Sequence, residues 1–221
     1  MRKLKVSPSL VGSYGLYLDN DWMTDEKLQS SIRREFSGNA ATSLGTAVHH
    51  MFEFCQEAKD GMSLEGVNEQ GENVVFGESW REHVYAYAEI NPIHEVWATK
   101  EIELNGDQVQ INMRCDGLKG LDLFEIKSTS SISYEKFYES PQWKFYMWAF
   151  GSQSVTYMVY APSKPDRFTG VVELRDYAYF EIPRPMDFDR VVSADLMPLI
   201  AGLIDYCENN NLMAYITQET K

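Results

Sequence analysis

Two carboxylates and a lysine, spaced as catalytic groups often are, lie near the middle of the sequence. Asp116 ends one segment with strand-like alternation, and Glu125 and Lys127 lie in the next such segment. Side chains alternate between the faces of a strand, so Glu125 and Lys127 are expected on one face, opposite Phe124 and Ile126. Asp116 precedes them across a tight connection. The pattern predicts two carboxylates and one ammonium group at one edge of a sheet.

This set of groups suits the hydrolysis of phosphodiester bonds. Carboxylate oxygens are the ligands that Mg²⁺ or Mn²⁺ prefers, and the ion keeps open positions for water and a phosphate oxygen. The ion lowers the pKa of its water and neutralises charge on the phosphate, while a nearby lysine can orient or deprotonate that water. Taken alone, however, the three residues are better explained as a solvated strand edge with a cross-strand ion pair.

Two further pairs of polar residues have helical spacing. His49 and Glu53 are one turn apart on one face of a predicted helix, and Gln142 and Tyr146 have the same spacing in another. A helix that begins at Pro141 would place Gln142 in its positively polarised first turn, where a phosphate could be held. These pairs add candidate ligands and substrate contacts to the carboxylates.

The first part of the chain is predicted to be mostly helical. Ser7 and Pro8 are typical of an N-cap followed by a first-turn proline. Apolar residues recur with helical spacing in the longest of these segments. The predicted elements are helices over 7–18, 25–36, 43–59 and 78–89, with an exposed loop over 60–77.

The second part changes to a strand pattern. Asn105-Gly106 is a strong hairpin signal, and Lys119-Gly120 predicts another turn. The predicted strands are 95–104, 108–118, 121–127, 154–161 and 170–182, with helical segments at 134–150 and 187–209. Runs of adjacent strands flanked by helices indicate a mixed α/β sheet in a single domain, residues 1–221.

The order of the motifs resembles a known superfamily. Gly45-x-x-x-His49, Asp116, Glu125-x-Lys127 and Gln142-x-x-x-Tyr146 follow one another as in the RecB-type branch of the PD-(D/E)XK nucleases, which includes phage recombination exonucleases. The resemblance covers about residues 43–160, with 7–36 and 187–209 as helical appendages. It implies a restriction-endonuclease-like core of α-β-β-β-α-β type.

The resemblance also implies a role for each matched residue. Lys127 would be the catalytic lysine, and Gln142 and Tyr146 would contact DNA or order the site. The implied ligands of Mg²⁺ or Mn²⁺ are His49, Asp116, Glu125 and the carbonyl of Ile126.

Other acidic residues could approach the same metal. Lambda-type exonucleases have a further glutamate on the strand before the aspartate, and either Glu101 or Glu103 could correspond to it. Glu53 is a further candidate because it shares a helical face with His49. His50 points about 100° away from His49 and is expected to be structural.

Composition limits the class of protein. The chain has 221 residues, of which 44% are hydrophobic, and no segment approaches the length of a membrane span, so a cytoplasmic protein is expected. Its three cysteines include no Cys-x-x-Cys pair, so no iron–sulfur cluster is expected, although several relatives carry one. The net charge of −13 leaves either no nucleic acid partner or a local basic, metal-lined cleft on an acidic body.

The resemblance and the charge together suggest how the protein would act. A compact chain without helicase motifs resembles a phage or prophage exonuclease that works on DNA with a single-strand annealing protein, in a bacterial or phage-infected cell. Basic residues are sparse apart from Arg2, Lys3, Lys5, Arg33 and Arg34, which favours an exonuclease that retains DNA by enclosure, in a narrow cleft or a homo-oligomer. Two alternatives are an inactive nuclease-fold module that binds DNA or protein, and a metal-dependent enzyme with another substrate.

Overall fold

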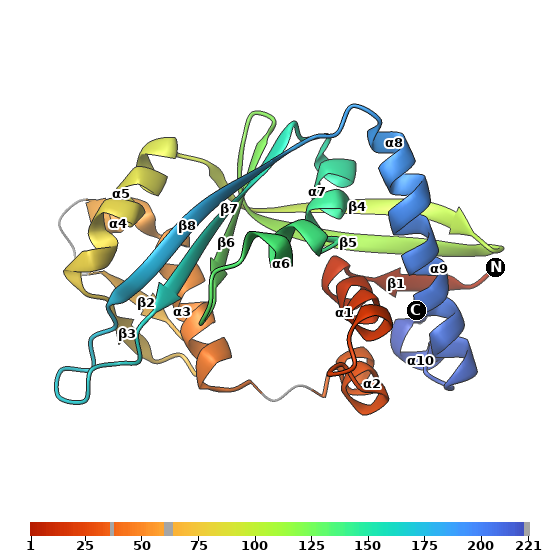
Figure 1. Cartoon of the computed structure of the whole chain (residues 1–221), viewed down its shortest axis with the longest axis horizontal. Helices are drawn as coiled ribbons and strands as arrows, with labels where there is room; N and C mark the ends of the chain where they lie inside the picture. Colours follow the sequence, from red (N-terminus) through yellow and green to blue (C-terminus); the bar gives the residue numbers. More distant parts are fainter. Residues whose placement is uncertain (36–37, 60–63, 219–221) are drawn as a thin grey trace.

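The computed structural model of the chain describes residues 1–35, 38–59 and 64–218. Its centre is a mixed six-stranded sheet in the order β1-β5-β6-β7-β8, with β4 paired to the other edge of β5 (Figure 1). The strands are β1 (Lys3–Val6), β4 (Ile93–Leu104), β5 (Asp107–Lys119), β6 (Asp122–Ser128), β7 (Ser154–Pro162) and β8 (Leu174–Pro183). The expected fold class, a mixed α/β sheet flanked by helices, is confirmed.

The β4–β5 hairpin has the turn that its sequence predicts. Leu104 pairs with Asp107, so only Asn105 and Gly106 form the loop. Both have positive φ, 52° and 83°, as a type I′ turn requires. A two-residue turn fixes the register of the whole hairpin, and the pairing continues to Ile93 and Leu118.

The sheet divides where β5 and β6 diverge. β5 pairs with β1 over Gln108–Ile111 and with β6 only over Gly117–Lys119. Beyond Phe124, β6 pairs only with β7, in parallel, as far as Ser128. Residues 112–116 of β5 and 125–128 of β6 therefore face a gap in the sheet. In this gap backbone and side-chain groups of both strands are available for other partners.

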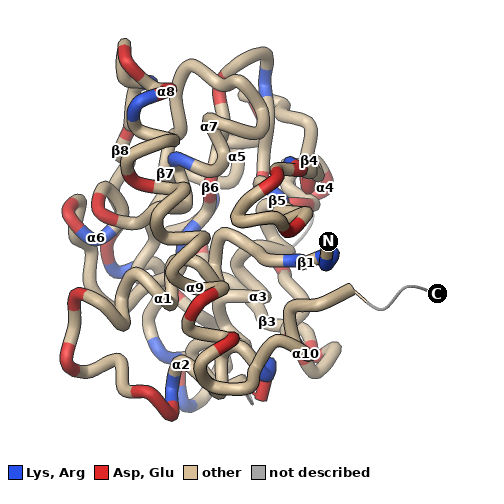
Figure 2. The backbone as a smooth tube through the Cα atoms, turned by 90° about the vertical axis from the view of Figure 1, so that its right-hand side faces the viewer, with Lys and Arg blue, Asp and Glu red and all other residues tan. Residues whose placement is uncertain are grey.

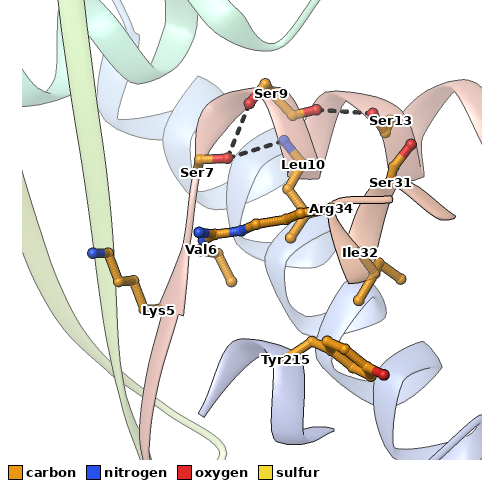
Figure 3. A pocket seen from close by; sticks show the side chains of 10 residues that line it. All are labelled: Lys5, Val6, Ser7, Ser9, Leu10, Ser13, Ser31, Ile32, Arg34 and Tyr215. Carbon is orange, nitrogen blue, oxygen red and sulfur yellow. Dashed lines mark hydrogen bonds between the residues drawn. The ribbon is translucent and has the colours of Figure 1, made fainter. Parts of the chain in front are cut away.

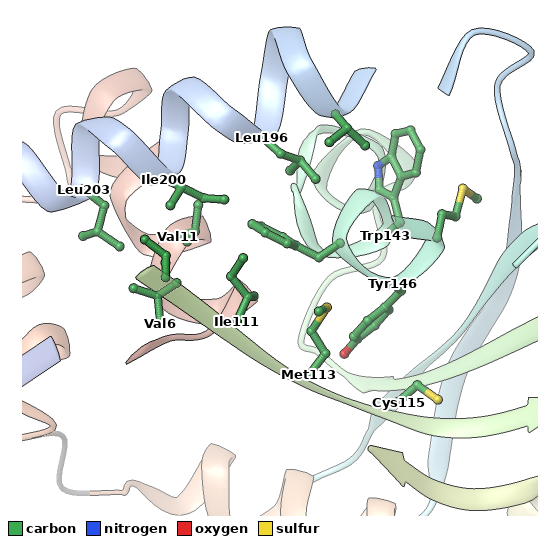
Figure 4. Close-up of a cluster of buried hydrophobic side chains, with 14 of the residues drawn as sticks. Val6, Val11, Ile111, Met113, Cys115, Trp143, Tyr146, Leu196, Ile200 and Leu203 are labelled. Carbon is green, nitrogen blue, oxygen red and sulfur yellow. The ribbon is translucent and has the colours of Figure 1, made fainter. Parts of the chain in front are cut away.

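One face of the sheet packs against three helices in the larger of two buried clusters. Helices α1 (Pro8–Asp19), α7 (Gln142–Phe150) and α9 (Met197–Asn209) pack on it, and Figure 4 shows α9 lying over β5 with Ile200 and Leu203 directed at the sheet. The alternate residues Val109, Ile111 and Met113 of β5 supply the strand side of this core.

The opposite face is covered only in part. Helices α3 (Ala40–Glu53) and α5 (Arg81–Ile90) pack over β6 and β7 there, in a second buried cluster that includes Phe52, Tyr87 and Ile126. The long β4–β5 ribbon extends beyond these helices (Figure 1). Its residues on this face are therefore not enclosed by the second cluster.

Several elements differ from those the sequence predicts. The N-terminal strand β1 was not predicted, because its four residues become a strand only by pairing with β5. The predicted loop 60–77 contains a hairpin of β2 (Glu65–Val67) and β3 (Asn73–Val75), while its residues 60–63 lie outside the described residues.

Helices occur in the predicted regions, but some of these regions contain two helices in place of one. Ser7 caps α1 as expected, accepting a hydrogen bond from the N–H of Leu10. The predicted helix 43–59 is interrupted at Phe54. The segment 134–150 is two helices that meet at Ser140-Pro141, and the second begins one residue after the proline at which a helix start was expected. The remaining helical elements are α2 (Asp25–Arg33), α4 (Cys55–Lys59), a 3₁₀ turn (Glu78–Trp80), α6 (Tyr134–Glu139), α8 (Phe188–Val191), a π-turn (Val192–Leu196) and α10 (Met213–Ile216). No helix within the described part of the chain is long and apolar enough to cross a bilayer.

Candidate active site

Asp116 bridges the gap between the diverging strands. Its Oδ2 accepts a hydrogen bond of 2.7 Å from the N–H of Ile126 on β6. Its Oδ1 lies 3.3 Å from Nδ1 of His49 on α3. The residue is only 8% exposed. We call this gap between residues 112–116 of β5 and 125–128 of β6 the fork. At the fork a carboxylate takes the place of a strand–strand hydrogen bond, and the contact with the Ile126 N–H holds this carboxylate beside β6.

Glu125 is the most enclosed acid of the site, with 3% of its surface exposed. Its Oε1 accepts hydrogen bonds from Lys127 Nζ at 2.5 Å, Gln142 Nε2 at 2.9 Å and Tyr146 OH at 3.1 Å. Its Oε2 is buried and has no hydrogen-bond partner. A buried carboxylate oxygen without a partner is costly, so this atom is available to a ligand such as a cation.

Gln142 and Tyr146 act on the site through Glu125. The two side chains are joined by a 2.7 Å hydrogen bond from Gln142 Nε2 to Tyr146 OH, one turn apart on α7. Tyr146 OH also lies 2.9 Å from the carbonyl oxygen of Arg114 on β5. The structure therefore brings both predicted residues within hydrogen-bond distance of Glu125. Their roles in ordering the site and in contacting DNA stay predictions.

The ionisation of the site is set by burial and by the neighbouring charges. Burial raises the pKa of Glu125 to about 7, with Lys127 opposing the shift and Asp116 adding to it. Burial acts to raise the pKa of Asp116 too, but the contacts with His49, Lys127 and the Ile126 N–H outweigh it and lower that pKa. Burial acts to lower the pKa of His49, but Asp116 outweighs it and raises that pKa. A cation that binds Glu125 must displace its proton, so metal affinity should rise with pH up to about 7.

Glu95 belongs to the site although no sequence motif singled it out. It lies on β4 between the pairs His94–Gly117 and Val96–Cys115, and so falls beside Asp116. Its φ is +53°, a strained value for a residue with a side chain. Burial raises its pKa, Arg114 opposes this from 2.7 Å, and the charge of Asp116 adds to it. Counting back from the two-residue turn would have identified Glu95 from the sequence.

The other acidic candidates lie elsewhere. Glu101 and Glu103 pair with Gln110 and Gln108, near the far end of the hairpin from Asp116. At the rise of a strand, about 3.4 Å per residue, Glu101 is about 20 Å along the ribbon from Asp116. Glu53 is exposed on α3, and its charge acts on both Glu95 and His94. The structure therefore places Glu53 at the rim of the site and separates Glu101 and Glu103 from it.

The two adjacent histidines have different surroundings. His49 contacts Asp116. The ring of His50 packs against that of Phe54, with centroids 4.5 Å apart and an angle of 32° between the planes. The buried Nδ1 of His50 has no hydrogen-bond partner. We expect His49→Ala to weaken Mn²⁺ binding measured by titration calorimetry. We expect His50→Ala to leave that affinity unchanged and to alter only the melting temperature. Loss of Mn²⁺ affinity in His50→Ala alone would show that the other face of α3 serves the metal.

The residues at the fork fit a hard divalent cation. Asp116 and Glu125 supply carboxylate oxygens, and Glu125 Oε2 lacks a partner. The N–H and C=O of a strand residue point to the same edge, so the Ile126 carbonyl faces the fork, as its N–H does. Within residues 1–35, 38–59 and 64–218, however, no three His, Cys, Asp or Glu side chains are gathered closely enough to hold a metal ion. Glu125 Oε1 is paired with Lys127 Nζ, at 2.5 Å.

The basic residues near the N-terminus differ in whether they form ion pairs. Arg2 is paired with Asp107 and Glu208, and Arg33 lies 3.9 Å from Glu35. Lys5 and Arg34 have no ion pair with any residue that the structure describes. Both line a surface pocket of about 530 Å³, shown in Figure 3 with Val6, Ser7, Ser9, Leu10, Ser13, Ser31, Ile32 and Tyr215. On the side of the molecule seen in Figure 2, acidic and basic positions are otherwise interspersed.

Comparison with known proteins gives remote structural likenesses. No protein-family model matches the chain, and no curated protein sequence matches it. Two crystal structures of the alkaline exonuclease LHK-Exo from Laribacter hongkongensis resemble it. The dAMP complex has a TM-score of 0.48 and 14% sequence identity, and the match covers 95% of this chain and 93% of that one. The other structure has a TM-score of 0.39 and 19% sequence identity, and the match covers 94% of this chain and 93% of that one. The crystal structure of SSO0001 has a TM-score of 0.41 and 17% identity over 82% of this chain and 85% of that one. The function of this protein is therefore inferred from the side chains at the fork.

Proposed function

We propose that the protein is a Mg²⁺- or Mn²⁺-dependent deoxyribonuclease of the PD-(D/E)XK type, with its active site at the fork between β5 and β6. The observation that supports this best is Glu125, which is buried between Lys127 and Asp116 with Oε2 unpartnered. A solvated strand edge would leave this acid exposed to water. An acid that is buried, has a raised pKa and lies beside a lysine is typical of a functional site.

The residues would divide the reaction between them. A divalent ion held by Asp116, Glu125, the Ile126 carbonyl and His49 would supply an activated water and neutralise charge on the phosphate. Lys127, whose pKa stays raised because Glu125 outweighs the effect of burial, carries the positive charge that orients the water or stabilises the transition state. Gln142 and Tyr146 keep Glu125 in one orientation. Glu95 provides a further carboxylate beside Asp116 and takes the place proposed above for Glu101 or Glu103.

The acidic surface favours an exonuclease within this class. Acidic residues outnumber basic ones by 33 to 20, so a grip along duplex DNA would be weak in physiological salt. Capture of an end, with retention by a narrow cleft or a homo-oligomer, avoids this limit. The motif resemblance adds a role in recombination or repair beside a single-strand annealing protein, in the cytoplasm of a bacterial or phage-infected cell.

Linear and covalently closed plasmid DNA distinguish these possibilities. With Mg²⁺ the protein should degrade the linear form and leave the closed circle intact, and EDTA should stop the reaction. Equal cutting of both forms would contradict the exonuclease, and binding without cutting would indicate an inactive module. Light scattering on the same sample gives the mass, and a monomer that digests processively would contradict retention by a ring.

Lys5 and Arg34 provide a test of DNA contact that does not depend on cleavage. If both contact phosphates, the double substitution Lys5→Ala with Arg34→Ala should reduce the slope of log affinity against log salt by about 1 per lost contact. Anisotropy of a labelled DNA in EDTA measures this slope. The matched control is Lys164→Ala with Arg167→Ala, which removes the same charge from the exposed segment between β7 and β8. An equal reduction in both double variants would show that only net charge matters.

A further inference from the structure

The uncovered part of the sheet carries a polar surface next to the fork. Val96 on β4 packs against the core of the covered face, so its neighbour Trp97 projects from the opposite face. Trp97 pairs with Arg114, and Thr99 pairs with Asn112, across the β4–β5 hairpin. Thr99 and Asn112 are joined by a 3.1 Å hydrogen bond. This surface has one aromatic ring among hydrogen-bonding groups, which is unlike a protein core.

Trp97 is held in position but is not covered. It is 68% exposed, and the Arg114 guanidinium lies over its ring, 5.6 Å from the centroid. Arg114 is itself fixed by Glu95, at 2.7 Å. The three side chains form a layer in which Glu95 orients the cation and the cation lies against the indole. Most of the ring still faces solvent and is available to another flat group.

This layer adjoins the catalytic carboxylates. Arg114 and Asp116 are alternate residues of β5, so their Cα atoms are about 7 Å apart. The Tyr146 hydroxyl lies 2.9 Å from the backbone carbonyl oxygen of Arg114 and 3.1 Å from Glu125 Oε1, so it links the two residues. A strand whose phosphate lies at Asp116 would therefore have a neighbouring nucleotide within reach of Trp97.

We propose that Trp97, backed by Arg114, is a stacking platform for an unpaired nucleobase of the DNA strand that is cut. This inference rests on the proposed function and adds a substrate class to it, namely a single-stranded or frayed end. Aromatic side chains and arginine planes bind unpaired bases of any sequence in this way, whereas a base inside an intact duplex has both faces occupied. The platform would supply affinity that the acidic surface does not supply through phosphates.

Binding of short labelled oligonucleotides in EDTA tests the platform. Trp97→Leu should weaken binding of single-stranded DNA about 5- to 100-fold, while Trp97→Phe, which keeps an aromatic face, should weaken it no more than about threefold. A blunt hairpin duplex and an abasic strand of equal length should bind both variants within about twofold of the wild type. Trp22→Leu is the matched control, because Trp22 is 56% exposed and also lies beside a cation, Lys27, but at the α1–α2 connection.

The abasic strand decides between stacking and a structural role. If Trp97→Leu weakened the abasic and the normal strand equally, or the duplex more than the single strand, the proposal would be overturned. Melting temperatures of the variants check that the fold is intact. Mg²⁺-dependent cleavage is measured separately. Its absence would overturn the nuclease and leave the binding result standing, whereas cleavage with unchanged binding by Trp97→Leu would overturn the platform alone.

Discussion

Replacement of Asp116 by asparagine should abolish Mg²⁺-dependent cleavage of linear DNA while the protein stays folded. Asparagine keeps an oxygen that can accept the hydrogen bond from the Ile126 N–H, which is 2.7 Å from the carboxylate in the wild type. It removes the negative charge that would hold the cation. The expected result is a loss of rate to background, with a melting temperature within a few degrees of the wild type.

Asp122→Asn is the control for this substitution. Asp122 is exposed at the start of β6, and its contact is a hydrogen bond from Ser154. It makes the same chemical change on the strand that carries Glu125, so its rate should equal that of the wild type. Cleavage at the wild-type rate by Asp116→Asn would exclude the fork as the metal site.

Lys127→Ala should lower the cleavage rate by about 10²- to 10⁴-fold, the range typical of a group that acts in proton transfer or charge stabilisation. Lys127 also opposes the rise in the pKa of Glu125, so its removal should raise that pKa above about 7. Metal binding would then shift to higher pH. Single-turnover rates should therefore be compared at saturating Mg²⁺ and on both sides of neutral pH.

The pH comparison separates the two effects of this lysine. If Lys127 acted only by keeping Glu125 ionised, raising the pH would restore the full rate of Lys127→Ala. A catalytic role predicts that metal binding recovers and the rate does not. Lys100→Ala is the control, because Lys100 lies over Trp148, away from the fork, and its removal should leave the rate unchanged.

Local sequence signals determined much of the scaffold. Asn105-Gly106 adopted the two positive φ values that its composition predicts, and this turn alone fixed the register of the longest hairpin. Ser7 and Pro8 marked the start of α1 for the same kind of local reason. The motif residues His49, Asp116, Glu125, Lys127 and Gln142 also lie together, on four elements around the fork.

Features that depend on distant partners were missed or misplaced. β1 has too short a pattern to be recognised and exists because β5 pairs with it. Glu101 and Glu103 fitted the expected position of an extra acid, yet the register places Glu95 beside Asp116 instead. The position of Glu95 beside Asp116 could have been predicted by counting back from the two-residue turn. The positive φ of Glu95 could not, because it arises from a distortion of the paired strands.

The sequence by itself determined which residue types this protein has for chemistry and which elements carry them, because helical and strand periodicities are local properties of the chain. The tertiary structure alone decided where β5 and β6 separate, that Glu125 is buried with one oxygen unpartnered, and that Trp97 stays exposed. These three features depend on where the pairing of the strands stops and on how much of the sheet the helices cover. Both are set by contacts between residues far apart in the chain. The same contacts bury Glu125 beside Lys127 and Asp116, and this burial raises its pKa.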